Sequence, residues 1–167
     1  MEVVIQKMQT SDIDAIYEIE KSAYGEHHWS RESFYNEIKN NIGFYIVARN
    51  PQNNEIAGYL GSWFIVDECH ITNVAVNFNF RRQKIAKQLM IALINHCYEK
   101  FIKYITLEVR VSNTPAISLY EKFGFKSIGV RKKYYQDNNE DALIMFTENI
   151  WHEKFKTVYN NFVGNIQ

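Results

Sequence analysis

Basic side chains gather in the segment RRQKIAKQLM, residues 81–90, where Arg81, Arg82, Lys84 and Lys87 have no acidic residue among them. Apolar residues then recur at helical spacing, which predicts the N-terminus of a long helix. Unpaired backbone N–H groups and the helix dipole suit that position to an anion such as phosphate. A solvated basic turn is the alternative, but basic residues there oppose the dipole unless an anion offsets them. We therefore expect a phosphate-bearing ligand at this helix start.

Two titratable side chains interrupt segments that alternate like strands, Glu108 in KYITLEVRV and His70 in CHITNVAV. Propensity disfavours a carboxylate in a strand, and partial burial would raise the pKa of Glu108 towards the range of a useful general base. The alternative is a glutamate on an exposed face, paired with Arg110. His70 is a second candidate base because histidine titrates near neutral pH, although a lone histidine is more often structural.

The composition is that of one globular domain without a net charge. The chain has 167 residues, 46% hydrophobic and 15% aromatic, which is enough to bury a sizeable core. Basic and acidic residues both number 19, so the net charge gives no reason to expect a nucleic-acid partner. Residues 1–40 hold eight acidic and four basic side chains. They could attract a cationic partner, although a solvated helix face is their commoner role.

The cysteines and the distribution of apolar residues predict a cytoplasmic protein. Cys69 and Cys97 lack the spacing of a zinc site and allow at most one disulfide, which favours a reducing compartment. No apolar run approaches the roughly 20 residues that cross a bilayer, and the N-terminal segment does not resemble a targeting signal. We therefore expect neither a bound metal nor a membrane partner.

Hydrophobic periodicity predicts an α+β fold in which a strand and two helices come first. Three consecutive strands, within residues 43–76, are then expected to form an antiparallel meander. A long helix from Gln83, a strand, a short helix and two final strands follow. This order indicates a crossover connection and hence a mixed sheet. We expect residues 1–149 to form one domain and residues 150–167 an amphipathic helical tail, which packs either on the body or on a second copy.

Several segments, in this order along the chain, resemble the GCN5-related N-acetyltransferases (GNAT). RRQKIA matches, except at Lys84, the loop Gln/Arg-x-x-Gly-x-Gly/Ala, whose backbone amides hold the pyrophosphate of acetyl-coenzyme A in that family. DECHITNVAV precedes it, and LEVRVSNTPAISLYEKFGF and VRKKYYQDNNEDALIM follow. Together they are similar to the ribosomal-protein-alanine N-acetyltransferase branch, from about Val3 to Thr147. The resemblance implies a mostly antiparallel twisted sheet of about seven strands, flanked by helices and splayed at the acetyl-coenzyme A site.

The resemblance also implies roles for individual residues. Glu108 corresponds to the proton acceptor of the reaction, and Tyr120 to the tyrosine that protonates the sulfur of coenzyme A. Cofactor contacts are implied for one strand, the loop and one asparagine: Val74, Ala75, Val76, Arg81, Arg82, Gln83, Lys84, Ile85, Ala86 and Asn113. Segments flanking the acceptor amine contribute Trp29, Asp67, Glu68, Tyr134, Tyr135 and Glu140.

Each implied role has a structural alternative. Val74, Ala75 and Val76 would equally suit a plain core strand, Asn113 could simply cap the next helix, and most tyrosines serve packing. In the family the strand at 74–76 carries a bulge that aims main-chain N–H groups at the acetyl carbonyl. Sequence patterns alone do not decide between these interpretations.

Lys84 departs from the family loop, which has glycine at this position. Lysine is harmless there if the native φ is helical, but it costs stability if φ is positive. Because Ala86 keeps the small position, and Arg81 and Arg82 keep the charge, we predict the tolerated conformation.

The resulting hypothesis is direct acetyl transfer from acetyl-coenzyme A to the N-terminal alanine of small-subunit ribosomal protein eighteen, without a metal. A related alternative is another protein N-terminus or a small amine as acceptor. A non-catalytic coenzyme A binding module would need neither Glu108 nor Tyr120. Self-association through the tail is a further expected interaction.

Overall fold

The computed structural model describes residues 1–164, so the last three residues of the expected 150–167 tail lie outside the described part. The chain groups into two compact units. The first comprises Met1–Phe64 and Ile71–His96, and the second comprises Ile65–His70 and the chain from Cys97 onward. Strand β4 contributes residues to both units. None of the helices within residues 1–164 is long and apolar enough to cross a membrane.

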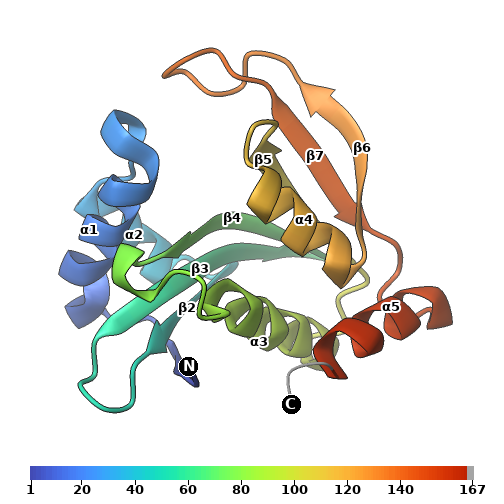
Figure 1. Cartoon of the computed structure of the whole chain (residues 1–167), viewed down its shortest axis with the longest axis horizontal. Helices are drawn as coiled ribbons and strands as arrows, with labels where there is room; N and C mark the ends of the chain where they lie inside the picture. Colours follow the sequence, from blue (N-terminus) through green and yellow to red (C-terminus); the bar gives the residue numbers. More distant parts are fainter. Residues whose placement is uncertain (165–167) are drawn as a thin grey trace. The chain divides into compact units, whose positions relative to one another are not determined.

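Seven strands form a single sheet in the order β1-β2-β3-β4-β5-β7-β6, which confirms the expected mixed fold (Figure 1). Pairing is antiparallel for β1 with β2, β2 with β3, β5 with β7, and β6 with β7. The strands are β1 Val4–Lys7, β2 Gly43–Arg49, β3 Ile56–Ile65, β4 Glu68–Val76, β5 Tyr104–Arg110, β6 Phe125–Arg131 and β7 Ala142–Thr147. The helices are α1 Ile13–Tyr24, α2 Arg31–Lys39, α3 Ile85–Glu99, α4 Thr114–Phe123 and α5 Glu153–Val163.

In the first unit, the apolar faces of α1 and α2 join the strands in one core. Ile16 of α1 and Phe34 of α2 are fully buried in the same cluster as Val47 and Tyr59. Ser30 caps α2 as the sequence predicts, because its Oγ accepts a hydrogen bond of 3.1 Å from the Ser33 N–H. This core holds the strands that lead to the predicted phosphate loop.

Gly58 permits a close approach of β3 to β4. A Cβ at this position would lie 2.8 Å from the carbonyl oxygen of Ala75, so any side chain would push the two strands apart. Ala75 belongs to the segment predicted to contact the cofactor. The fold therefore fixes the backbone of that segment through a glycine on the neighbouring strand.

In the second unit, β5 buries Ile105, Leu107 and Val109 on one face. Strand β5 ends at Arg110, and Val111, the next residue in the apolar alternation, is exposed. The opposite face of β5 carries Glu108 and Arg110.

Helix α4 is capped at both ends. The side chain of Asn113 accepts a hydrogen bond of 3.3 Å from the Ala116 N–H, and Gly124 ends the helix with φ of +103°. Helix α5, formed by the predicted tail, packs its buried Phe155 against Gly124 and its buried Tyr159 near Phe123. The apolar side of this helix is therefore used within its own unit.

Candidate active site

The segment before α3 has a backbone suited to an anion. Arg82 and Lys84 have φ of +62° and +61°, while Gln83 between them is not among the residues with positive φ. This alternation turns successive N–H groups towards one side, as in the concave anion-binding arrangement called a nest. The first turn of α3, from Ile85, adds N–H groups without helical partners. The backbone geometry fits a phosphate group, in a segment that also carries Arg81, Arg82 and Lys84.

The predicted tolerated conformation of Lys84 is wrong. Its φ of +61° lies in the left-handed region, where a Cβ crowds the following carbonyl group. The positive φ also explains why the helix begins at Ile85, two residues later than the periodicity suggested. The protein therefore keeps the loop shape that glycine would adopt without strain, although the residue is lysine.

Lys84→Gly is expected to raise the free energy of unfolding by a few tenths of a kcal/mol to about 1 kcal/mol, because relief of left-handed strain exceeds the entropy that glycine adds to the unfolded chain. Thermal unfolding should show a Tm higher by about 1–3 °C. Lys84→Ala removes the charge but keeps the Cβ, so this control should show no such gain. If both variants gain equally, the strain lies elsewhere. Titration should reveal only a modest change in acetyl-coenzyme A affinity for Lys84→Gly.

Strand β4 carries Val74, Ala75 and Val76 in the first unit. The carbonyl oxygen of Val74 accepts a hydrogen bond of 2.9 Å from the Tyr24 hydroxyl, and Ala75 is buried. The bulge predicted for this strand stays a prediction. The hydrogen bond from Tyr24 links α1 to the backbone of this segment.

Glu108 lies in the second unit between the side chains of His70 and Arg131. Its Oε2 lies 2.6 Å from His70 Nε2, and its Oε1 lies 3.5 Å from Arg131 Nε. The side chain of Glu108 is 13% exposed and that of His70 is 30% exposed. The two residues named separately as candidate bases are thus hydrogen-bonded partners.

The pKa of Glu108 is lowered, whereas the sequence led us to expect it raised. The hydrogen bond with His70 is the largest cause, and the charges of His70 and Arg131 add to it, so together they outweigh desolvation. Arg110, the pairing partner considered in the structural alternative, instead binds the loop between β6 and β7. Glu108 is therefore ionised at neutral pH and hydrogen-bonded to His70.

Tyr120 projects from α4 and is buried, with 7% exposure. Burial raises the pKa of its phenol, and the neighbouring Tyr135 raises it further. The hydroxyl consequently stays protonated throughout the neutral range, as a proton donor requires. Asn113 lies seven positions earlier and caps the same helix, which is the structural role considered for it.

The expected acceptor-side residues have different environments. Trp29 packs near Phe34 in the first unit, and its backbone N–H donates a 3.1 Å hydrogen bond to the carboxylate of Glu20. Asp67 lies in the turn before β4, and Glu68 is the first residue of that strand. The Asp67 carbonyl oxygen accepts hydrogen bonds from the backbone N–H groups of residues 103 and 104. Tyr134, Tyr135 and Glu140 lie between β6 and β7.

Sequence patterns do not reveal that Glu20 is buried. Its carboxylate accepts hydrogen bonds from the Tyr59 hydroxyl and the Trp29 N–H, and burial raises its pKa. Asn73 of β4 also bonds to Glu20, while Asn73 Oδ1 is buried without a partner. A lone acid on an amphipathic helix is normally read as exposed, and only the tertiary structure reveals this network.

Comparisons with known proteins identify the family to which this chain belongs. Residues 13–125 match the model of the Acetyltransferase (GNAT) family. A Bacillus subtilis (strain 168) protein with the provisional name ribosomal protein bS18-alanine N-acetyltransferase is 42% identical over 143 residues, covering 85% of this chain and 93% of that protein. The Escherichia coli (strain K12) ribosomal protein bS18-alanine N-acetyltransferase is 34% identical, with 84% and 94% covered.

The crystal structure of the Escherichia coli ribosomal-protein-S18-alanine N-acetyltransferase shares the fold. Its TM-score is 0.79 at 29% identity, over 89% of this chain and 94% of that chain. The family model covers more than half of the chain, and the similarity to the bacterial enzymes extends over most of it. The chain belongs to the GNAT family of acetyltransferases.

Proposed function

We propose that this protein transfers an acetyl group from acetyl-coenzyme A to the N-terminal alanine of ribosomal protein bS18. The observation that carries the proposal is the pairing of Glu108 with His70 at 2.6 Å, in a chain whose bacterial relatives bear that activity in their names. A protein that only bound coenzyme A would not need a proton-accepting pair.

The first unit supplies the cofactor-binding elements. Backbone N–H groups of residues 82–86 hold the pyrophosphate, and the side chains of Arg81, Arg82 and Lys84 balance its charge. Main-chain groups of residues 74–76 polarise the acetyl carbonyl and orient the donor. Acetyl-coenzyme A contributes the thioester, whose carbonyl carbon is the electrophile.

The second unit supplies the proton transfers. The Glu108–His70 pair takes a proton from the substrate ammonium group, which frees the nitrogen lone pair for attack on the thioester carbon. A C–N bond then forms, the C–S bond breaks, and Tyr120 donates its hydroxyl proton to the departing sulfur. The second proton that the nitrogen loses as the amide forms returns the Tyr120 phenolate to the hydroxyl. Binding both reactants together removes the need for a covalent enzyme intermediate.

Residues of two loops are proposed to contact the acceptor. Trp29 precedes α2, and Tyr134 and Tyr135 lie in the loop between β6 and β7. Burial is the main cause that raises the pKa of both phenols, and the charge of Glu108 raises it further. Asp67 and Glu68 would attract the basic residues of the substrate.

Intact mass spectrometry tests the proposal. Purified bS18 incubated with this protein and acetyl-coenzyme A should gain one acetyl group at its N-terminal alanine. A bS18 sample whose N-terminus is already blocked, and an unrelated basic peptide, should gain none. Acetylation of the unrelated peptide alone would show that the acceptor is a different amine and not bS18. Binding of acetyl-coenzyme A without any acetylation would contradict it.

A further inference from the structure

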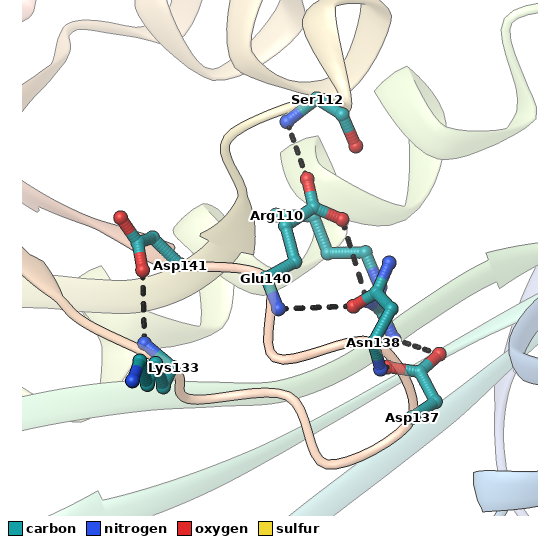
Figure 2. Close-up of polar contacts among 7 residues, drawn as sticks. All are labelled: Arg110, Ser112, Lys133, Asp137, Asn138, Glu140 and Asp141. Atoms are coloured by element: carbon teal, nitrogen blue, oxygen red, sulfur yellow. Dashed lines mark hydrogen bonds and ion pairs between the residues drawn. The ribbon is translucent and has the colours of Figure 1, made fainter.

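The loop between β6 and β7, residues 132–141, is irregular but closely held (Figure 2). The Lys133 N–H donates to the Asp141 carboxylate at 2.9 Å, and the Glu140 N–H donates to Asn138 Oδ1 at 3.0 Å. Lys133 and Asn139 have φ of +53° and +57°. A lysine in the left-handed region persists only where surrounding contacts impose it, so this loop has a fixed shape.

Arg110 is the centre of these contacts, although it belongs to β5 (Figure 2). Its guanidinium donates to Asp137 at 2.8 Å, to Asn138 Oδ1 at 3.2 Å and to Glu140 at 3.4 Å. The same group lies over the ring of Tyr135, with its central carbon 4.0 Å from the centroid. One planar side chain therefore holds four residues of the loop.

Glu140 extends the network to the turn before α4, the helix that carries the proposed general acid Tyr120. Its carboxylate accepts a hydrogen bond of 2.9 Å from the Ser112 N–H, in the turn that leads to the Asn113 cap of α4. Hydrogen bonds from Ser112, first from its hydroxyl and then from its backbone N–H, are the largest reasons why the pKa of Glu140 is lowered. Because its carboxylate is engaged with Ser112 and Arg110, we assign Glu140 to holding the loop rather than to contacting substrate.

Loop 132–141 lies near Glu108 and Tyr120, the two groups proposed to transfer protons. Arg131, the last residue before the loop, has its Nε 3.5 Å from Glu108 Oε1. Arg110, which lies over the Tyr135 ring, is two residues from Glu108 on the same face of β5. Burial is the main cause of the raised pKa of Tyr120, and the neighbouring Tyr135 raises it further. A substrate amine that reaches Glu108 therefore brings its following residues beside this loop.

We infer that Arg110 is a positioning residue for the acceptor: it holds loop 132–141 in the shape that receives the substrate polypeptide. The inference rests on the proposed function. A loop that is already ordered loses less conformational freedom on binding, which strengthens acceptor binding without changing cofactor binding. Lysine cannot replace arginine here, since a single ammonium cannot span three acceptors and stack on a ring.

The test compares steady-state kinetics of Arg110→Gln, Arg110→Lys and the wild type with bS18 as acceptor. Arg110→Gln should raise the KM for bS18 about tenfold or more, with less than a twofold change in the KM for acetyl-coenzyme A. Arg110→Lys should recover only part of the loss. Amide hydrogen exchange should become faster within residues 133–141 of both variants.

Lys126→Gln is the matched control. Lys126 lies in β6, at the end of the β6–β7 pair remote from the loop, and forms a 2.8 Å ion pair with Glu148. This variant loses one charge from the same hairpin and should keep both KM values.

An unchanged KM for bS18 in Arg110→Gln would overturn the inference while the proposed function stands. An equal rise in both KM values, or a fall in kcat alone, would also overturn it, since either result indicates general structural damage. If the wild type acetylates no bS18, the proposed function fails and the inference fails with it.

Discussion

Glu108→Gln is expected to lower kcat by about 10²–10⁴-fold, the usual contribution of a positioned general base. The substitution keeps the size of the side chain but removes the negative charge beside His70 and Arg131. It eliminates the carboxylate as a proton acceptor. Acetyl-coenzyme A binding should stay intact, because the residues proposed to hold the cofactor's phosphates lie in another part of the chain.

The measurement is single-turnover acetylation at saturating acetyl-coenzyme A, with cofactor affinity determined separately by titration. His70→Gln separates the two members of the pair: a smaller loss than that of Glu108→Gln would make the carboxylate the proton acceptor, and an equal loss would make the pair the functional unit. Glu148→Gln is the matched control, since Glu148 is also a carboxylate with a lowered pKa, held by Lys126 and Lys154. An unchanged kcat in Glu108→Gln would remove Glu108 from the mechanism.

The pH dependence of stability gives a second check on Glu108. Its folded-state pKa is lowered, so the folded protein favours the ionised form. The stabilisation is fully present above the unfolded-state pKa, about 4.3 for glutamate, and disappears as the pH falls through the lower folded-state value. Glu108→Gln should therefore unfold at a lower Tm than the wild type at neutral pH, and the difference should shrink at acidic pH.

Much of the fold follows from local patterns, as β5 and α4 illustrate. Alternation places Ile105, Leu107 and Val109 on the buried face of β5, and Glu108 consequently faces the other way. The sequence Asn113-Thr114-Pro115 is a standard helix start, and Gly124 a standard helix end. Such signals depend on neighbouring residues and need no tertiary information.

The errors concern properties that depend on distant residues or on backbone conformation. The direction of the pKa shift of Glu108 is decided by His70, 38 positions away in the sequence. The structural alternative paired Glu108 with Arg110, whereas the folded chain places Arg110 on the loop between β6 and β7 and Arg131, from β6, beside the carboxylate. The φ of Lys84 is imposed by the loop against the preference of lysine, so the residue type gave the wrong expectation.

Tyr120→Phe is expected to lower kcat by about 10²-fold or more, because the departing sulfur loses its proton donor. Phenylalanine fills the same space next to Phe125 and the hydroxyl is the only group removed, so the fold should be retained. Tyr159→Phe is the matched control: Tyr159 is equally buried, burial raises its pKa to about 12, and it packs in α5 near Phe123. This variant should keep full activity.

The identity of the leaving group can distinguish proton donation from packing. Protonation of the sulfur matters less when the departing thiol is more acidic, so the defect of Tyr120→Phe should shrink with an acetyl thioester of an acidic thiol. The relevant comparison is the ratio of wild-type to variant rates for that donor and for acetyl-coenzyme A, with the same acceptor. A ratio that does not change between donors would indicate that Tyr120 only shapes the site. A ratio that falls towards one would assign its proton to the sulfur, because a packing defect slows the transfer from either donor alike.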